Sequence, residues 1–409
     1  MVQLGQGVGL PKRTPRREEL PSFAKHTHRY YSRMHILVVC KSLDRPESFI
    51  LRGLHERGER VTVLAHRENQ HSEMLESSGV PVHPFPLRHR LDIRGMVRLR
   101  RFVISQEVNV VYALSNAGLS AANFGLLGLP VPITAYRGTI GQLNRFDPSS
   151  WLTFFHPRVR LILCVAQAVE HDLNRRGIPK EKTATVYKGH DLSWYHASPN
   201  VSRSGFGIPE DAFVVGCTAT CRPGKGIETL LASCASLLSV YPQLHVVLIG
   251  SIRGDEVRRA VREFPDPVRL HLLGHRPEAA HLATLSDVTV LVSDRREGLP
   301  KSVLEAMAQG IPAIVSRVGG MPELVKNGEA GLVVPPMDSP ALAHAIQRLA
   351  NDRKYAQRLG LAGQARVAQE FHVDHTIDRM LSLFRGVVCE KLRGAASSAL
   401  LAQRLNSDT

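Results

Sequence analysis

The sequence lacks any uninterrupted apolar run of the about 20 residues that a membrane-spanning helix needs. It also lacks the apolar core of a secretory signal, because the N-terminal region is polar and basic, as in "PKRTPRREEL" at 11–20. A protein with neither feature is expected in the cytoplasm, and its cysteine usage agrees with that compartment. The six cysteines are scattered, most of them inside apolar runs, so reduced thiols are the expected state.

Motifs for metal and nucleic-acid binding are missing as well. The stretch "CTATC", with Cys217 and Cys221, has the wrong spacing for a zinc site and no histidine partner. No helix-turn-helix, zinc finger or ribonucleoprotein motif is present, which disfavours a dedicated nucleic-acid binder. We therefore predict neither a metal ion nor a nucleic-acid partner.

Acidic residues are in deficit. The chain has 37 Asp and Glu against 52 Lys and Arg, which gives a formal net charge of +15. With nucleic acid disfavoured, such an excess suits a phosphorylated substrate or an acidic membrane surface. At 409 residues the chain is too long for one ordinary core, so two domains are expected.

From Met34 onward, strand-like apolar runs alternate with helical patterns. The expected strands are "HILVVC", "RVTVLA", "NVVYAL", "PITAYR", "RLILCVA" and "TATVY" in the first half, and "AFVVGCT", "LHVVLIG", "VRLHLLG", "VTVLVS", "PAIVS" and "AGLVVP" in the second. This alternation predicts βαβ units and a mainly parallel sheet. Ser, Pro and Gly interrupt the pattern around 196–208, as in a linker, and the alternation then resumes. The predicted fold is α/β, with two doubly wound, Rossmann-like domains that face each other across a central cleft. Ligands are expected in that cleft, at the carboxyl ends of the strands.

The second half of the chain contains a basic loop in "GCTATCRPGKGIETLLAS". A buried strand leads into Arg222 and Lys225, and Gly226 then opens an amphipathic helix. An arginine can contact two phosphate oxygens at once, a lysine adds a compact charge, and nearby N–H groups add to both. The alternative is an ordinary basic turn between a strand and a helix, because the glycine spacing is not that of a P-loop.

The stretch "EGLPKSVLEAMAQG" places two carboxylates around the start of a helix. Pro300 suits the first helical turn, since its missing N–H costs nothing there. Beyond it, free N–H groups would face an anion such as a diphosphate; they belong to Lys301, Ser302 and Val303. Glu297 lies just outside this helix, where sugar hydroxyls would satisfy its carboxylate. Glu305, within the helix, is placed to accept hydrogen bonds from a second polyol, such as a ribose.

The block that begins with this stretch resembles the donor-binding region of family 4 (group 1) glycosyltransferases. The E-x7-E motif is Glu297 and Glu305, followed by the Gly-Gly of "VGGMPELV" and by "GLVVP", while "RPGKG" precedes it. The resemblance covers residues 34 to about 375. It implies a GT-B fold and transfer from a nucleotide-diphosphate sugar with retention of anomeric configuration. The absence of an Asp-x-Asp motif fits the family's metal-independent design, so no cofactor is expected.

Carried over by position, the catalytic groups are Glu297, which holds hydroxyls of the transferred sugar, and Arg222 and Lys225, which neutralise the diphosphate. Glu305 holds the ribose. The other donor-binding positions offer mainly backbone to the base, the phosphates and the sugar: Gly250, Gly274, His275, Arg276, Gly298, Leu299 and Pro300. UDP and GDP are the nucleotides that the family favours. Departure of the leaving group puts charge on the diphosphate, and fixed cations stabilise that charge most in the transition state.

The resemblance also assigns the parts of the chain. The expected parts are a basic, disordered N-terminal extension (1–33), an acceptor-binding domain (34–195), a linker (196–208), a donor-binding domain (209–375), and a C-terminal helix that packs back on the first domain and ends in a frayed tail (376–409).

The acceptor is expected on loops that follow strands of the first domain, at Lys41, Ser115, Asn116, Arg137 and Gly138. Two of these loops depart from the family. The first, "KSLDRPE", is not glycine-rich, which puts phosphate cradling there in doubt. The other has Arg137 where many relatives have histidine, and arginine cannot act as a general base. Arg137 could aid the leaving phosphate or an anionic acceptor, or form a structural ion pair.

A further departure is "VYKGHDLSWY", where relatives usually have Asn-Gly. His190 is more readily explained as a hinge or core residue than as a catalytic one. The stretch "LRHRLDIRGMVRLRRFVI" carries four arginines at helical spacing: Arg90, Arg94, Arg98 and Arg101. Such a basic amphipathic helix suits an anionic membrane surface, and the alternative is the solvated face of a packed helix.

Together these features predict a retaining, metal-independent hexosyltransferase that uses a glycan or lipid-linked acceptor. Lipopolysaccharide, O-antigen or exopolysaccharide assembly is the expected pathway, in the cytoplasm or on the cytoplasmic face of the inner membrane. The alternatives are a GT-B-fold nucleotide-sugar epimerase and a non-catalytic nucleotide-sugar-binding protein.

Overall fold

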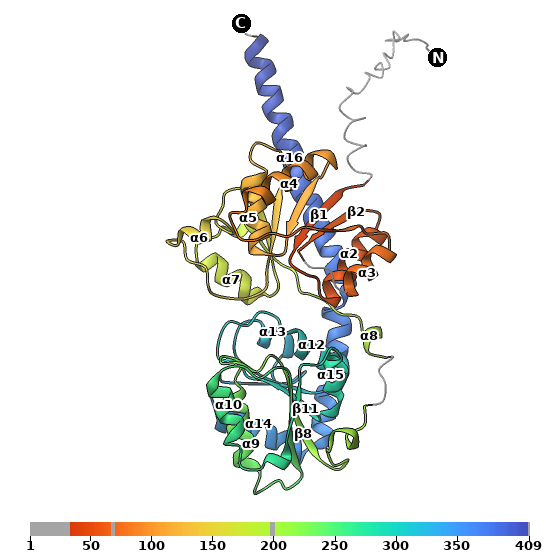
Figure 1. The fold of residues 1–409 in the computed structure, drawn as a ribbon, viewed down its shortest axis with the longest axis vertical. Helices are drawn as coiled ribbons and strands as arrows, with labels where there is room; N and C mark the ends of the chain where they lie inside the picture. The colour runs from red at the N-terminus through yellow and green to blue at the C-terminus, as the bar shows by residue number, and fades with distance from the viewer. Residues whose placement is uncertain (1–32, 67–69, 197–200, 408–409) are drawn as a thin grey trace, which may run out of the picture.

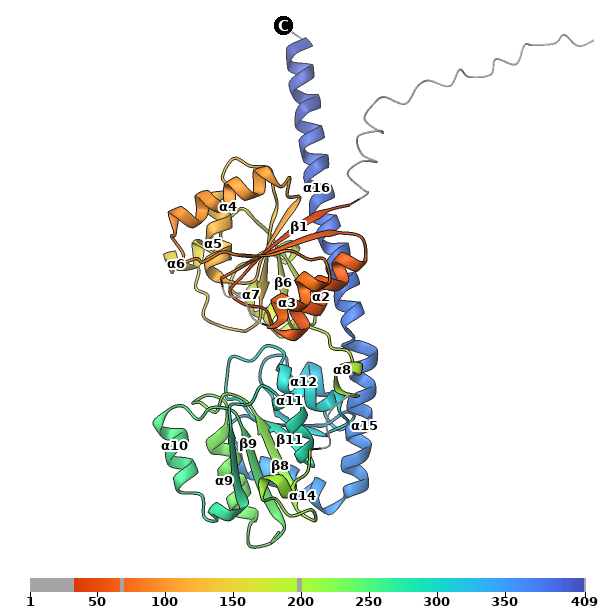
Figure 2. The same ribbon diagram turned by 45° about the vertical axis from the view of Figure 1, so that its right-hand side comes forward.

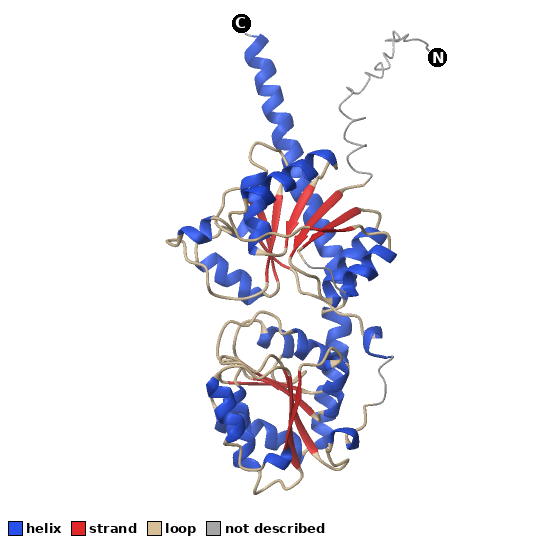
Figure 3. Cartoon of the chain, in the orientation of Figure 1, coloured by secondary structure: helices blue, strands red, loops and turns tan. Residues whose placement is uncertain are grey.

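The structure is a computed structural model that describes residues 33–66, 70–196 and 201–407. The extension expected over 1–33 lies outside the described residues, except for Arg33. Two α/β domains stand one above the other, and two consecutive helices near the C-terminus run beside them (Figures 1 and 2). In each domain, helices cover both faces of a central sheet (Figure 3).

The first domain contains a seven-stranded parallel sheet in the order β3-β2-β1-β4-β5-β6-β7. Its strands are β1 (His35–Cys40), β2 (Arg60–Ala65), β3 (Val82–Pro84), β4 (Val110–Ala113), β5 (Ile133–Arg137), β6 (Val159–Cys164) and β7 (Thr183–Thr185). The sequence predicted all of these except β3, where Val82 is the only buried residue and no apolar run marks the strand. Adjacent residues of β1 enter opposite hydrophobic clusters, which is why the strand is apolar throughout.

The helices of this domain separate into two layers. The side chains of α2 (Arg45–Glu56) and α3 (Gln70–Ser77) join one hydrophobic cluster. Those of α4 (Ile93–Ser105), α5 (Asn116–Gly125) and α7 (Gln167–Arg175) join the other. The short elements are α6 (Pro148–Trp151) and the 3-10 turn η1 (Lys180–Lys182). Gly177 closes α7 with a φ of 97°, the left-handed conformation that favours glycine.

The second domain has a six-stranded parallel sheet in the order β10-β9-β8-β11-β12-β13, and the sequence predicted every strand. The strands are β8 (Phe213–Thr218), β9 (Leu244–Ile249), β10 (Leu270–Gly274), β11 (Val288–Leu291), β12 (Ala313–Ser316) and β13 (Leu332–Val334). The helices are α9 (Ile227–Leu237), α10 (Asp255–Arg262), α11 (Ala279–Leu282), α12 (Lys301–Ala308), α13 (Met321–Val325), α14 (Ser339–Asn351) and α15 (Arg353–Glu370), with 3-10 turns η3 (Pro267–Arg269) and η4 (Ala283–Leu285).

Two segments connect the domains. The first contains α8 (Ser193–His196), and its described continuation from residue 201 includes η2 (Ser204–Phe206). Val201 and Phe206 pack on buried residues of the second domain, so this end of the expected linker belongs to that domain.

The second connection is α16 (Val373–Ser407), which runs from the second domain along the first (Figure 2). It packs on α2, where Arg57 pairs with Asp374 and Asp378. The tail that the sequence predicted to fray after about residue 393 is helical to Ser407, in a stretch rich in the strong helix formers Ala and Leu. Within the described part of the chain, no helix combines the length and apolarity needed to cross a membrane.

Candidate functional site

A pocket of about 590 Å³ opens on the second domain, at the carboxyl ends of β8, β9 and β11. Its volume lies within the range usual for ligand sites. Eleven of the predicted catalytic and donor-binding residues line it: Arg222, Lys225, Gly250, His275, Arg276, Glu297, Leu299, Pro300, Lys301, Ser302 and Glu305. Gly274 at the end of β10, Gly298 before α12 and Val303 within α12 lie outside the lining.

Two glycines let the loops around the pocket approach one another. A Cβ on Gly226 would lie 2.0 Å from the carbonyl oxygen of Val292, and one on Gly250 would lie 1.8 Å from that of Ala219. Both glycines also have positive φ angles, 72° and 144°. No other residue fits either position without moving the backbone. The Gly226 contact holds the loop that carries Arg222 and Lys225 against the end of β11, and the Gly250 contact holds the start of that loop against the end of β9.

Lys225 and Glu297 form an ion pair inside the pocket. The carboxylate of Glu297 is 8% exposed and also accepts a hydrogen bond from Ser293 Oγ at 2.8 Å. The sequence predicted both residues but assigned them to different ligand groups. In the structure the ammonium neutralises the carboxylate, so Glu297 is not a bare anion beside the place expected for the diphosphate.

The helix α12 presents its N-terminus to this pocket. Pro300 is its N-cap residue, one position earlier than expected, and no side chain caps the helix. Lys301 and Ser302, the first residues of the helix, line the pocket. The uncapped N–H groups and the positive end of the helix dipole therefore make this wall favourable for an anion.

Glu305 is the second carboxylate of the pocket. Only 14% of its side chain is exposed, and the nearest cation, Lys301 Nζ, lies 3.6 Å away. Burial raises the pKa of Glu305, and the charge of Lys301 opposes that shift. A buried, weakly paired carboxylate gains from hydroxyl donors, which agrees with the role predicted for it beside a ribose.

Backbone contacts join this donor side to the first domain. A Cβ on Gly298 would lie 2.0 Å from the carbonyl oxygen of Gly138, and one on Gly320 would lie 2.6 Å from the Ala166 methyl group. Gly138, predicted on the acceptor side, therefore touches the loop between Glu297 and α12.

Among the described residues Arg137 forms no ion pair with a carboxylate, which was one of the roles considered for it. It is 8% exposed, donates to the carbonyl oxygen of Gly141, and lies over the ring of Phe154 at 5.2 Å. Asp172, the nearby carboxylate, pairs instead with Arg176 at 2.8 Å. The guanidinium holds the loop after β5 in place, because the turn at Gly141 offers it a buried carbonyl acceptor.

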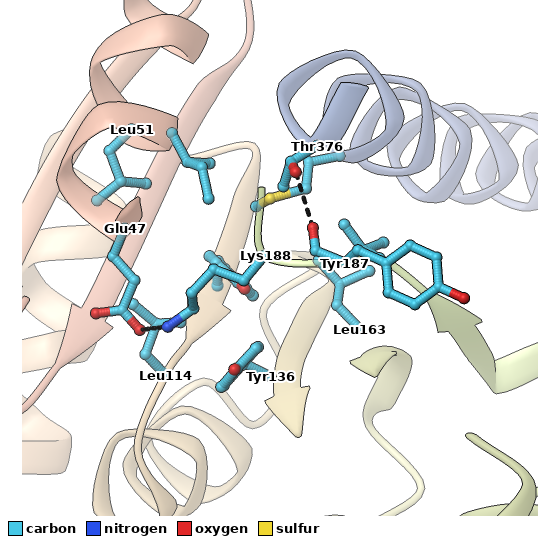
Figure 4. Close-up of a pocket in the computed structure, with 12 residues that line it drawn as sticks. Glu47, Leu51, Leu114, Tyr136, Leu163, Tyr187, Lys188 and Thr376 are labelled. Atoms are coloured by element: carbon cyan, nitrogen blue, oxygen red, sulfur yellow. Dashed lines mark hydrogen bonds and ion pairs between the residues drawn. The ribbon is translucent and has the colours of Figure 1, made fainter. Parts of the chain in front are cut away.

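The first loop of the chain also has a structural explanation. Asp44 caps α2 and Glu47 accepts from the Asp44 N–H, so acidic side chains satisfy the helix start in the loop where phosphate cradling was in doubt. Lys188 lies 2.7 Å from Glu47 and 3.4 Å from Asp44, beside a small pocket of the first domain (Figure 4). Lys188 thus ties the connecting segment to α2.

His190 is a core residue of the connecting segment, which is one of the two roles, hinge or core, that the sequence favoured for it. It is 1% exposed, its Nδ1 lies 2.7 Å from the Tyr195 hydroxyl, and its backbone bonds to Phe371 and Val373 beside the start of α16. Burial lowers the pKa of His190 to about 3, so the ring is neutral.

The remaining acceptor-side predictions lie at the carboxyl ends of β1 and β4. Lys41 and Asn116 are exposed, and Ser115 caps α5 by accepting from the N–H of Gly118 at 3.1 Å. None of the three lines the donor pocket. The sequence reasoning in turn missed Ser293, which holds Glu297, and several lining residues that share no motif: Thr218, Thr220, Pro277, Ala279 and Ala280.

The arginines predicted to share one helical face are only partly on α4. Arg90 precedes the helix, because Asp92 is the N-cap residue. Its guanidinium donates to the Ser149 carbonyl oxygen. Arg98 bonds to the Pro86 carbonyl and lies over Phe85. Arg94 and Arg101 are exposed. The outer face of α4 also carries large apolar side chains that are 45–73% exposed: Ile93, Val97 and Ile104.

Two family models match the chain. The model described as Glycosyltransferase Family 4 matches residues 50–194, and the one described as Glycosyl transferases group 1 matches residues 200–366. The D-inositol 3-phosphate glycosyltransferase of Thermobifida fusca is 26% identical over 55% of this chain and 55% of its own length. The N-acetyl-alpha-D-glucosaminyl L-malate synthase of Bacillus anthracis is 22% identical over 70% of this chain and 76% of its own. The chain thus spans about half the length of the inositol-phosphate relatives that it matches.

Solved structures share the fold. HepE of Anabaena, in complex with UDP and glucose, has a TM-score of 0.75 at 22% identity, over 86% of this chain and 100% of its own. A sucrose-phosphate synthase of Thermosynechococcus elongatus has a TM-score of 0.71 at 20% identity, over 87% and 100%. Both likenesses extend over the two domains together, and the shared arrangement is the GT-B fold.

Proposed function

The chain belongs to the family 4 (group 1) glycosyltransferases, and on that premise we propose that it transfers a sugar from a nucleotide-diphosphate sugar to a glycan or lipid-linked acceptor. The transfer retains the anomeric configuration and needs no metal ion. The observation that carries the proposal is the pairing of Lys225 with Glu297 beside the uncapped N-terminus of α12.

The diphosphate would lie between Arg222, Lys225 and the start of α12. Charge grows on it as the sugar leaves, and fixed cations with aligned N–H groups stabilise the later state more than the earlier one. These groups supply the positive charge that a divalent ion supplies elsewhere. Lys225 would then face both the departing phosphate and Glu297, which is placed to hold hydroxyls of the transferred sugar.

UDP is the nucleotide we favour, with GDP as the second. HepE was solved with UDP and with UDP-glucose, which supports this order. The base would meet Gly274, His275 and Arg276 at the end of β10, where backbone groups offer hydrogen bonds to it.

For the acceptor we place the reaction in lipopolysaccharide, O-antigen or exopolysaccharide assembly, on the anionic cytoplasmic face of the inner membrane. The outer face of α4 supports this location. Exposed Ile93 and Val97 lie beside exposed Arg94 and Arg101, and this combination suits the boundary between lipid headgroups and acyl chains. Each arginine near such a surface contributes about 1 kcal/mol of attraction.

Calorimetric titration with UDP, GDP and ADP, with EDTA present, tests the donor site. We expect one nucleotide to bind, and binding to none of the three contradicts the proposal. Release of nucleotide on mixing donor and acceptor then separates a transferase from a GT-B-fold epimerase or a non-catalytic binding protein, because neither of these frees the nucleotide.

A further inference from the structure

The helix α7 begins without a side-chain cap from its own domain. Its N-cap residue is Ala166, whose methyl group cannot accept a hydrogen bond. The first N–H groups of an α-helix have no partner within the helix, so an acceptor must come from elsewhere. Figure 1 shows α7 at the lower edge of the first domain, facing α13 of the second domain.

The acceptor is Glu323 of α13. One of its carboxylate oxygens accepts from the N–H of Gln167 at 2.8 Å, and the other accepts from the N–H of Ala168 at 2.6 Å. The hydroxyl of Tyr187, where the connecting segment leaves the first domain, donates to the same carboxylate at 3.1 Å. Hydrogen bonds from N–H groups to a carboxylate are stronger than neutral ones, and the positive end of the α7 dipole adds to them.

We propose that Glu323 is a positioning residue for sugar transfer, whose carboxylate holds the two domains at the spacing at which donor and acceptor meet. The first domain supplies the N–H groups at the start of α7, and the second domain supplies the carboxylate that caps them. Closure of the cleft therefore completes the hydrogen bonds of α7, and opening leaves both the N–H groups and the carboxylate to water.

Short backbone contacts connect Glu323 to the donor loop. The turn before α13 contains Gly319, where a Cβ would lie 2.0 Å from the Glu297 carbonyl oxygen. In the same turn the N–H of Gly320 donates to the carbonyl oxygen of Gly298 at 3.0 Å. Any shift of α13 therefore reaches the loop that carries Glu297.

The opposite side of α13 is anchored in its own domain. Arg366 of α15 donates to the carbonyl oxygens of Glu323 and Leu324 at 2.7 and 2.9 Å. Because Arg366 fixes α13 to the second domain, the Glu323 carboxylate moves with that domain. Its hydrogen bonds to α7 therefore depend on the position of the whole second domain.

Glu323 does not line the donor pocket, so its loss should leave nucleotide affinity intact. The test compares Glu323→Ala and Glu323→Gln with Asp338→Ala, a control that removes a carboxylate of the same kind. Asp338 caps α14 by accepting from the N–H of Ala341 at 2.8 Å, but within one domain. Three readouts are small-angle X-ray scattering, calorimetry with UDP, and UDP release from UDP-glucose; only the last two rest on the proposed function.

We expect Glu323→Ala to enlarge the radius of gyration, to keep the UDP Kd within about threefold of the parent value, and to slow UDP release by about tenfold or more. Glu323→Gln keeps one accepting oxygen and should recover part of the rate, while Asp338→Ala should match the parent in all three readouts. Scattering of Glu323→Ala identical to the parent, or equal loss of rate in Asp338→Ala, overturns the proposal. If the parent binds none of UDP, GDP and ADP, the proposed function falls, and scattering alone still decides whether Glu323 holds the domains.

Discussion

Lys225 and Glu297, 72 residues apart in the chain, lie against each other as an ion pair at the centre of the donor pocket. The lysine comes from the loop after β8 and the glutamate from the loop before α12. The pair joins the group predicted to meet phosphate to the group predicted to meet sugar, so the two residues should respond differently to substitution.

Replacing Glu297 with alanine should affect the rate much more than nucleotide binding. The substitution removes the acceptor for sugar hydroxyls but leaves Lys225 available to the diphosphate. We expect turnover to fall by about a hundredfold or more, the scale seen when one group that stabilises a transition state is removed. The UDP Kd, measured by calorimetry, should stay within about threefold. Unchanged turnover would show that this carboxylate is wrongly assigned.

Replacing Lys225 with alanine should weaken nucleotide binding and also destabilise the fold. It leaves the Glu297 carboxylate buried without its counter-ion, which costs about 3 kcal/mol in comparable buried pairs. The double variant Lys225→Ala/Glu297→Ala removes the stranded charge, so its denaturant midpoint should recover most of the loss while turnover stays low. If the double variant is no more stable than Lys225→Ala, the unpaired Glu297 carboxylate is not the cause of the lost stability.

A methyl group on Gly298 should separate the domains where two of their loops lie close together. The added Cβ would lie 2.0 Å from the Gly138 carbonyl oxygen, and neither backbone can move without shifting a domain. We expect turnover of Gly298→Ala to fall by about tenfold or more. Gly205→Ala is the matched control, since its Cβ would meet nothing within 4 Å and its φ is not left-handed. Equal activity in the two variants would contradict the close interdomain contact.

Stability should fall as pH decreases below the ordinary pKa of histidine. His190 has a folded-state pKa of about 3 against a reference of 6.5, so the unfolded chain binds its proton first. Stability is therefore complete above about pH 6.5 and is lost toward pH 3, by at most about 1.4 kcal/mol per pH unit. Denaturant unfolding of the parent and of His190→Gln across this range should give a shallower slope for the variant. Parallel slopes would exclude His190 as the group responsible.

Membrane binding should depend on the outer face of α4. We expect the protein to sediment with vesicles that contain anionic phospholipid, and less with purely zwitterionic ones. The double variant Ile93→Glu/Val97→Glu should reduce vesicle binding by about tenfold or more. It replaces apolar side chains that would enter the membrane with negative charges that the anionic lipids repel. Arg262→Glu, an exposed change on α10 of the other domain, is the charge control. Vesicle binding by the α4 variant equal to that of the parent would show that the outer face of α4 is not the membrane-binding surface.

The sequence by itself determined the class of the fold and most of the donor pocket. Apolar strands buried on both faces can be recognised from local composition, and every strand of the second domain was predicted from it. Four charged residues of the donor pocket, Arg222, Lys225, Glu297 and Glu305, come from two short segments, so the spacing within each segment could be read from the sequence. Among the strands only β3 was missed, because Val82 is its only buried residue and no apolar run marks it.

The tertiary structure decided what depends on residues distant in the sequence. Whether Arg137 faces the cleft or turns to Gly141 depends on the loop around it, which no spacing reveals. The ion pair of Lys225 with Glu297 and the cap that Glu323 places on α7 each join separate parts of the chain. Such contacts arise when cores pack and buried polar groups find partners, and that pairing is settled by the whole fold and not by local pattern.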